Sequence, residues 1–124
     1  MKKVVVEGFE LEISSPFNNT IGTFDVISQP NNKFSVNDKK CFFGQINISL
    51  NGIVDNNTGN TQTEPLEVSI SGTSEKLFYG VNRAVLEGDS VNAVVTGISL
   101  SSVTVYWPVT IKIKSANQDK LYSN

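Results

Sequence analysis

The chain of 124 residues contains no histidine, one cysteine, one methionine and one tryptophan. Without histidine, the sequence lacks the commonest general base, the usual partner of a nucleophilic serine or cysteine, and the commonest metal ligand. The single cysteine, Cys41, excludes an internal disulfide bond, and its neighbours Phe42 and Phe43 predict a buried, unreactive thiol. We therefore expect no enzymatic activity and no cofactor.

Long apolar runs are also missing. The run Val4-Val5-Val6 ends at Glu7, whereas the core of a secretory leader needs about seven apolar residues. No segment approaches the roughly twenty apolar residues that cross a bilayer, so we expect a protein made in the cytoplasm without a signal peptide. The 10 basic and 12 acidic residues nearly balance. This balance predicts no nucleic-acid partner, because phosphate binding needs a basic surface.

The sequence is rich in apolar–polar alternation of period two, which is typical of half-buried antiparallel strands. No segment has the i, i+3, i+4, i+7 spacing of an amphipathic helix. We predict one all-β domain over residues 1–124, built from eight to ten short antiparallel strands and hairpins. The alternating segments are residues 9–13, 45–51, 66–70, 103–107 and 109–114.

Two segments interrupt this pattern. Residues 55–64 contain no apolar side chain, so we predict an exposed, mobile loop there. Residues 115–124 follow the last alternating segment, and we predict a loose C-terminal tail. Alternation also places Trp107 on the core face of its strand and Tyr106 on the opposite face.

Residues 72–89 carry the most specific pattern: Gly-Thr-Ser-Glu-Lys-Leu-Phe-Tyr-Gly-Val-Asn-Arg-Ala-Val-Leu-Glu-Gly-Asp. They predict a short hairpin that turns at Gly80 and a second turn at Gly88-Asp89, because glycine adopts turn conformations without steric cost. This spacing resembles the repeat of PAAR proteins, the conical tips that cap the spikes of contractile injection machines. Leu86 stands where that family has an arginine. The residues that would shape the repeat are Gly72, Phe78, Gly80, Ala84, Gly88 and Asp89.

The resemblance implies a cone of hairpins with pseudo-threefold repeats. One copy would cap a trimeric β-helical spike in a phage tail or type VI-like injection apparatus. It would sharpen the spike for transient contact with a membrane during puncture. Members of the family usually hold one zinc ion with histidines and a cysteine, so this chain would be a metal-free member. An internal repeat is visible at Phe42-Phe43-Gly44 and Phe78-Tyr79-Gly80, where an aromatic pair leads into a glycine.

A second interpretation is a β-sandwich binding module, such as a carbohydrate-binding, adhesin-like or virion decoration domain. It predicts two packed sheets and an exposed aromatic cluster or a loop site.

Overall fold

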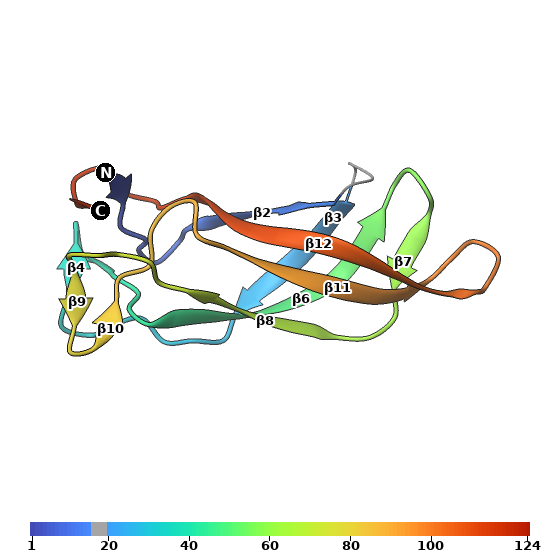
Figure 1. Cartoon of the computed structure of the whole chain (residues 1–124), viewed down its shortest axis with the longest axis horizontal. Helices are drawn as coiled ribbons and strands as arrows, with labels where there is room; N and C mark the ends of the chain where they lie inside the picture. The colour runs from blue at the N-terminus through green and yellow to red at the C-terminus, as the bar shows by residue number, and fades with distance from the viewer. Residues whose placement is uncertain (16–19) are drawn as a thin grey trace.

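A computed structural model describes residues 1–15 and 20–124. The prediction of an all-β chain is confirmed: the described residues form thirteen strands, all paired antiparallel, and no helix (Figure 1). The strands are β1 (Lys2–Lys3), β2 (Glu10–Ser14), β3 (Thr20–Val26), β4 (Ser35–Val36), β5 (Lys39–Lys40), β6 (Gln45–Asp55), β7 (Asn60–Gln62), β8 (Leu66–Ser71), β9 (Phe78–Tyr79), β10 (Asn82–Arg83), β11 (Ser90–Ile98), β12 (Thr104–Ser115) and β13 (Tyr122–Ser123).

The predicted number of strands, eight to ten, is too low. Six of the thirteen strands have only two residues. Alternation of period two needs about four residues to be visible, so the sequence pattern shows the long strands and misses the short ones.

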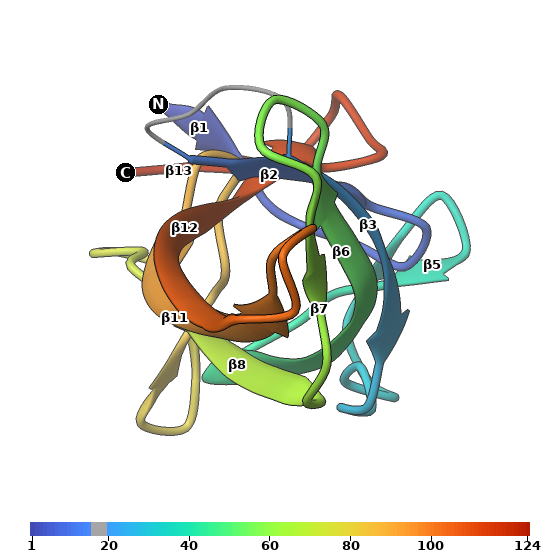
Figure 2. The ribbon, with the colours of Figure 1, turned by 90° about the vertical axis from the view of Figure 1, so that its right-hand side faces the viewer.

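The seven longer strands form one barrel-like sheet. Its order is β2-β12-β11-β7-β6-β3, and β8 pairs with the first half of β6. The outermost strands, β2 and β3, lie beside each other, so that the sheet nearly closes on itself around a central axis (Figure 2). This architecture differs from the two packed sheets of the sandwich interpretation.

The barrel interior is filled by the apolar residues of the alternating strands. Ile46, Ile48 and Leu50 of β6 are fully buried and pack with Ile111 and Ile113 of β12. The predicted orientations near the start of β12 agree with the structure: Trp107 is buried and Tyr106 points to solvent. Alternation thus selects the interior face of the long strands.

The six short strands form three antiparallel pairs at one end of the barrel: the hairpins β4–β5 and β9–β10, and the pair of β1 with β13, whose strands are the two ends of the chain (Figure 1). We call all three pairs hairpins. Viewed along the barrel axis, the hairpins spread outward around it (Figure 2). Between consecutive hairpins the long strands run out along the barrel and back: β2 and β3, then β6 to β8, then β11 and β12. We call this end the cap and the opposite end the far end.

The prediction of an exposed loop over residues 55–64 holds for only part of that segment: residues 56–58, 63 and 64 are exposed and lie outside strands, whereas Asp55 and residues 60–62 belong to strands. Asp55 is fully buried at the end of β6, where its carboxylate accepts hydrogen bonds from the backbone N–H of Asn57 (3.0 Å) and the hydroxyl of Thr58 (3.0 Å). Residues Asn60–Gln62 form β7, which pairs with β6 and β11. Polar side chains here satisfy backbone groups at a turn between strands, a use that composition does not reveal.

The prediction of a loose tail over residues 115–124 is also wrong. Ala116 and Ser123 are buried, and the Gln118 side-chain amide donates to the Val4 carbonyl (2.7 Å). The last strand of the tail, β13, pairs with β1 at the other end of the chain. The partner is more than a hundred residues away in sequence, so no local pattern indicates the pairing. In the described part of the chain, no helix is long and apolar enough to traverse a bilayer.

Candidate functional site: a threefold cap

Each hairpin of the cap belongs to a longer unit that occurs three times. We call these units cap repeat 1 (residues 118–124 followed in space by 1–8), cap repeat 2 (residues 31–44) and cap repeat 3 (residues 74–88). The first is divided between the two chain ends, which lie side by side at the cap (Figure 1). The three units have the same course: a turn, a hairpin, three central residues and then a glycine. The central residues are 4–6, 41–43 and 84–86.

The hairpins of the three cap repeats have the same register. In each, the last residue of the second strand pairs with the first residue of the first strand. The residue before it pairs with the second residue of the first strand. Two positions are then left between the strands for the turn. The corresponding outer pairs are Lys3 with Tyr122, Lys40 with Ser35, and Arg83 with Phe78.

The middle residues of the three cap repeats form a closed cycle of backbone hydrogen bonds. The N–H of Val5 donates to the carbonyl of Val85 (2.9 Å), that of Val85 to Phe42 (3.1 Å), and that of Phe42 to Val5 (3.2 Å). The flanking residues pair in the same cyclic order, through bridges Val4–Leu86, Val6–Cys41 and Phe43–Ala84. The cap is therefore pseudo-threefold symmetric about the barrel axis.

Each cap repeat ends at a glycine with positive φ, which directs the chain into the next barrel strand. Gly8, Gly44 and Gly88 have φ values of 83°, 85° and 95°. Other residues rarely adopt this region because Cβ collides with the backbone there. The second cap repeat reaches its glycine one residue sooner than the others, directly after Phe43.

The cap buries apolar side chains on both of its faces. Val5, Phe42 and Val85 belong to the barrel core. Their neighbours alternate to the opposite side and form a second, smaller core, which is covered by Phe34, Leu77 and Leu121. The buried members of the smaller core are Val4, Val6, Cys41, Ala84 and Leu86.

The structure brings the six residues named from the PAAR resemblance together in and around cap repeat 3. Phe78 lies in β9 under the guanidinium of Arg83, whose central carbon is 5.1 Å from the ring centroid. Gly80 has a φ of 65° in the hairpin turn, and Ala84 is buried as the first central residue. Gly72 packs against the backbone of Arg83 and Ala84, and Gly88 forms the final turn.

Asp89, the last of the six, is a buried turn residue. Its carboxylate accepts hydrogen bonds from the backbone N–H of Leu86 (2.8 Å) and the hydroxyl of Thr73. This contact ties the end of cap repeat 3 to the segment that leads into it. The side chain therefore acts on backbone geometry in this structure.

The two aromatic-pair segments do belong to repeated units, but they are not equivalent to each other in space. Phe42-Phe43-Gly44 corresponds in space to Val85-Leu86 and Gly88, and Phe78-Tyr79-Gly80 corresponds to Ser35-Val36-Asn37. The missed signal is a polar residue followed two positions later by a lysine and then by Leu or Phe. It occurs at residues 31–34, 74–77 and 118–121.

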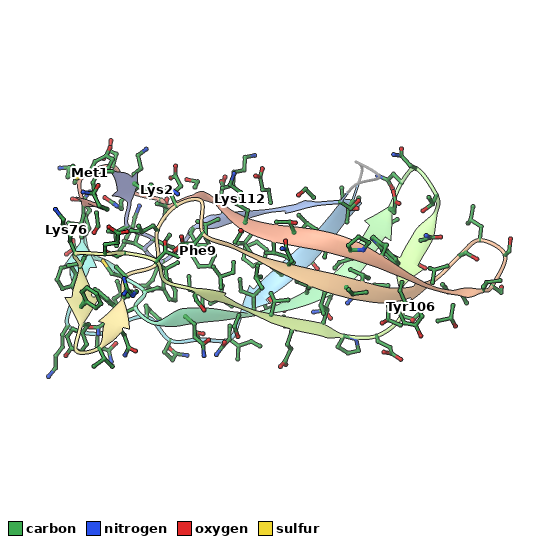
Figure 3. The ribbon with its side chains drawn as sticks, in the orientation of Figure 1. Met1, Lys2, Phe9, Lys76, Tyr106 and Lys112 are labelled. Carbon is green, nitrogen blue, oxygen red and sulfur yellow. The ribbon has the colours of Figure 1, made fainter. Side chains whose placement is uncertain are left out.

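This missed signal marks the outer surface of the cap. Phe34, Leu77 and Leu121 are partly buried over the smaller core, and the lysine before each of them is exposed. We call these six residues the cap face; its lysines are Lys33, Lys76 and Lys120. Figure 3 places Lys76 at the cap end of the molecule, far from Tyr106. The cap face has an apolar centre with one cation per repeat.

Cys41 is fully buried in the smaller core, as predicted. Burial disfavours the charged thiolate and raises the pKa of Cys41 from 9.0 to about 11. A group whose pKa is higher in the folded state contributes stability below its unfolded pKa. That contribution is fully present below pH 9.0 and is lost as the pH rises toward 11.

We expect Cys41, which is fully buried, to react with a thiol reagent at pH 8 at least about 100-fold more slowly in the folded chain than in urea. The reason is that two pKa units lower the thiolate fraction about 100-fold. Absorbance after addition of a chromogenic disulfide measures this rate, and Cys41→Ser gives the background. Equal rates in the folded and unfolded chain would contradict the burial of the thiol.

We expect Gly72→Asn to destabilise the fold by about 1–3 kcal/mol, the usual range for overpacking. A Cβ at this position would lie 2.3 Å from the carbonyl oxygen of Arg83 and 2.8 Å from that of Ala84. Gly80→Asn is the matched control, because no atom lies within 4 Å of its Cβ position and asparagine tolerates positive φ. Urea denaturation of both variants measures the difference. Equal midpoints would contradict close packing at Gly72.

Among the described residues, no cluster of three or more His, Cys, Asp or Glu side chains could hold a metal ion. The fold and the site define a pseudo-threefold cap on a seven-stranded antiparallel barrel-like sheet. No protein-family model matches the chain, and no curated protein or solved structure matches it.

Proposed function

We propose that the chain is a PAAR-like tip that caps one end of a trimeric β-helical spike, one copy per trimer, in a phage tail or type VI-like contractile injection apparatus. The closed cycle of three cap repeats carries this proposal. A single chain that repeats one surface three times about an axis can contact three identical chains in the same way.

The edges of the cap hairpins support this mode of binding. Within the described part of the chain, β4, β9 and β13 each pair only with the other strand of their own hairpin. The outer edges of β4 and β9 therefore carry backbone N–H and carbonyl groups that a further strand can use. The end of β13 already has a neighbour: the N–H of Glu75 donates to the carbonyl of Asn124, and the hydroxyls of Ser74 and Ser123 are hydrogen-bonded (2.6 Å). Spike chains that end in β-strands would extend the hairpins at these open edges.

The far end has the composition expected for contact with a membrane. Residues 90–111, which form β11, its turn and most of β12, contain no charged residue. This hairpin extends furthest from the cap (Figure 1). Leu100, Val103 and Tyr106 are 83%, 58% and 69% exposed. An uncharged leading hairpin avoids the high cost of moving ions into lipid, which supports transient membrane contact during puncture.

Packing replaces the zinc ion of the family in this proposal. In such tips, a bound metal ion stabilises an apex that is too narrow to hold a hydrophobic core. Here the barrel core continues toward the far end through Ile53, Val95 and Trp107, which are buried. Such a tip needs neither histidine ligands nor an arginine at the position of Leu86.

The test is stoichiometry. The chain is mixed with the trimeric β-helical spike protein encoded in the same genome, and the complex is weighed by native mass spectrometry. We expect one copy per three spike chains, and the same result for Leu100→Ser, which changes only the far end. Absence of binding, or three copies per trimer, would contradict the proposal.

A further inference from the structure

The three lysines of the cap face occupy equivalent backbone positions. The N–H of Lys33 donates to the Asn31 side chain (2.8 Å), and that of Lys120 donates to Gln118 (2.7 Å). The N–H of Lys76 makes a longer contact of the same kind with the Ser74 hydroxyl (3.4 Å). Each lysine is thus presented by the same side-chain-capped turn.

The three ammonium groups are also available for a partner. All three lysines are exposed, and none forms an ion pair with another described residue. The last residue of the second strand is also basic in all three repeats, as Lys3, Lys40 and Arg83. These three are not equally available: Lys40 is exposed, but Lys3 is half-buried, and Arg83 donates to the Ser74 carbonyl (2.9 Å) and covers Phe78. Lys33, Lys76 and Lys120 therefore form the one set of equivalent, exposed cations among the described residues of the cap.

Charge is distributed unevenly between the cap and the barrel. The three cap repeats hold eight of the ten basic residues and five of the twelve acidic residues. Their formal net charge is therefore +3, and that of the remaining chain is −5. Complementary potentials steer association and reject wrong partners, so the cap as a whole fits an acidic partner. On the cap face the three lysines outnumber the two adjacent carboxylates, Glu75 and Asp119.

We propose that the cap face recognises an acidic end of a homotrimer, with each lysine facing the same carboxylate on one of the three chains. This inference rests on the proposed function and specifies the chemistry of the partner. Three separate cations around an apolar centre match a partner that presents the same anionic group three times about its axis. A polyanion such as nucleic acid calls instead for a continuous basic stripe.

The probe is a homotrimeric β-helical needle with a flat end, made in two forms. One form carries glutamate and the other carries lysine as the last residue of each chain. We expect the chain to bind the glutamate form about 10- to 100-fold more tightly at low salt, a range set by three exposed ion pairs. The preference should shrink as salt is added.

The decisive variant is K33E/K76E/K120E, and K112E/K114E on the barrel strand β12 is the matched control. We expect the triple variant to prefer the lysine needle, and the control to behave as the unchanged chain. Circular dichroism establishes that both variants fold. Binding is measured by biolayer interferometry, with vesicles of phosphatidylcholine and phosphatidylglycerol as a second anionic surface.

The outcomes separate this inference from the proposed function. Equal binding of both needles by the chain and by its triple variant would leave the spike-capping proposal standing and overturn the role of the lysines. Binding of the anionic vesicles with loss in the triple variant, but of neither needle, would assign the lysines to a lipid surface. That result, or binding to none of the three probes, would overturn the inference about the lysines, while the stoichiometry with the spike encoded in the same genome decides the proposed function separately.

Discussion

Joining Asn124 to Met1 by a peptide bond should stabilise the protein by about 2–4 kcal/mol. Ser123 pairs with Lys2, as Val36 pairs with Lys39 across the two-residue turn of cap repeat 2. The two chain ends therefore stand where the other hairpins have their turns. Closing a loop of about 100 residues removes up to about 4.7 kcal/mol of chain entropy from the unfolded state, and the free energy of unfolding measures the gain.

The control for this prediction is the joined chain reopened between Asn37 and Asp38. These residues have φ values of 52° and 64° and form the turn of cap repeat 2. Because the cap repeats are equivalent, the reopened chain should fold and have about the stability of the original. A joined chain that is less stable than the linear one would contradict the placement of its ends.

Replacing Phe42 by alanine should cost about 3–5 kcal/mol, the range for a large aromatic in a core that relaxes only partly. Phe42 is the middle residue of cap repeat 2 and is 4% exposed. Its ring meets that of Phe9 edge-on, with centroids 5.5 Å apart. The substitution leaves a cavity where the cap meets the barrel. The shift of the urea midpoint at constant m value measures the loss.

Phe78→Ala is the matched control for Phe42→Ala. Phe78 is 41% exposed and contacts Arg83 at the surface of its hairpin. We expect a cost of about 1 kcal/mol, because an exposed cation–π contact contributes about 0.5–1 kcal/mol. Similar costs for the two phenylalanines would show that the cap does not pack on the barrel as described.

The long strands could be predicted from sequence because each satisfies a local rule. In β6 and β12, apolar residues alternate with polar ones over many positions, and one face meets the core. The turns at Gly80 and Gly88 could also be predicted, because both glycines adopt positive φ.

The threefold cap could not be predicted fully, because its symmetry is hidden by chain connectivity. Cap repeat 1 is divided between residues 118–124 and 1–8, so a search along the sequence finds only two whole units. Cap repeat 2 is one residue shorter before Gly44, which shifts the alignment of the visible pair. The pairing of β13 with β1 depends on the closed fold, and that is why residues 115–124 looked like a tail.

The hydrogen-bond cycle of Val5, Phe42 and Val85 has a consequence for any complex with a true trimer. Rotation by one third of a turn superimposes the backbone of each unit on the next, while the side chains differ. The chain can thus bind a symmetric trimer in three orientations of identical energy, since the chains of the trimer are indistinguishable. An image averaged over many such complexes would superimpose the three orientations. Separating them requires sorting the particles by a feature that breaks the threefold symmetry, such as the projecting loop after β11.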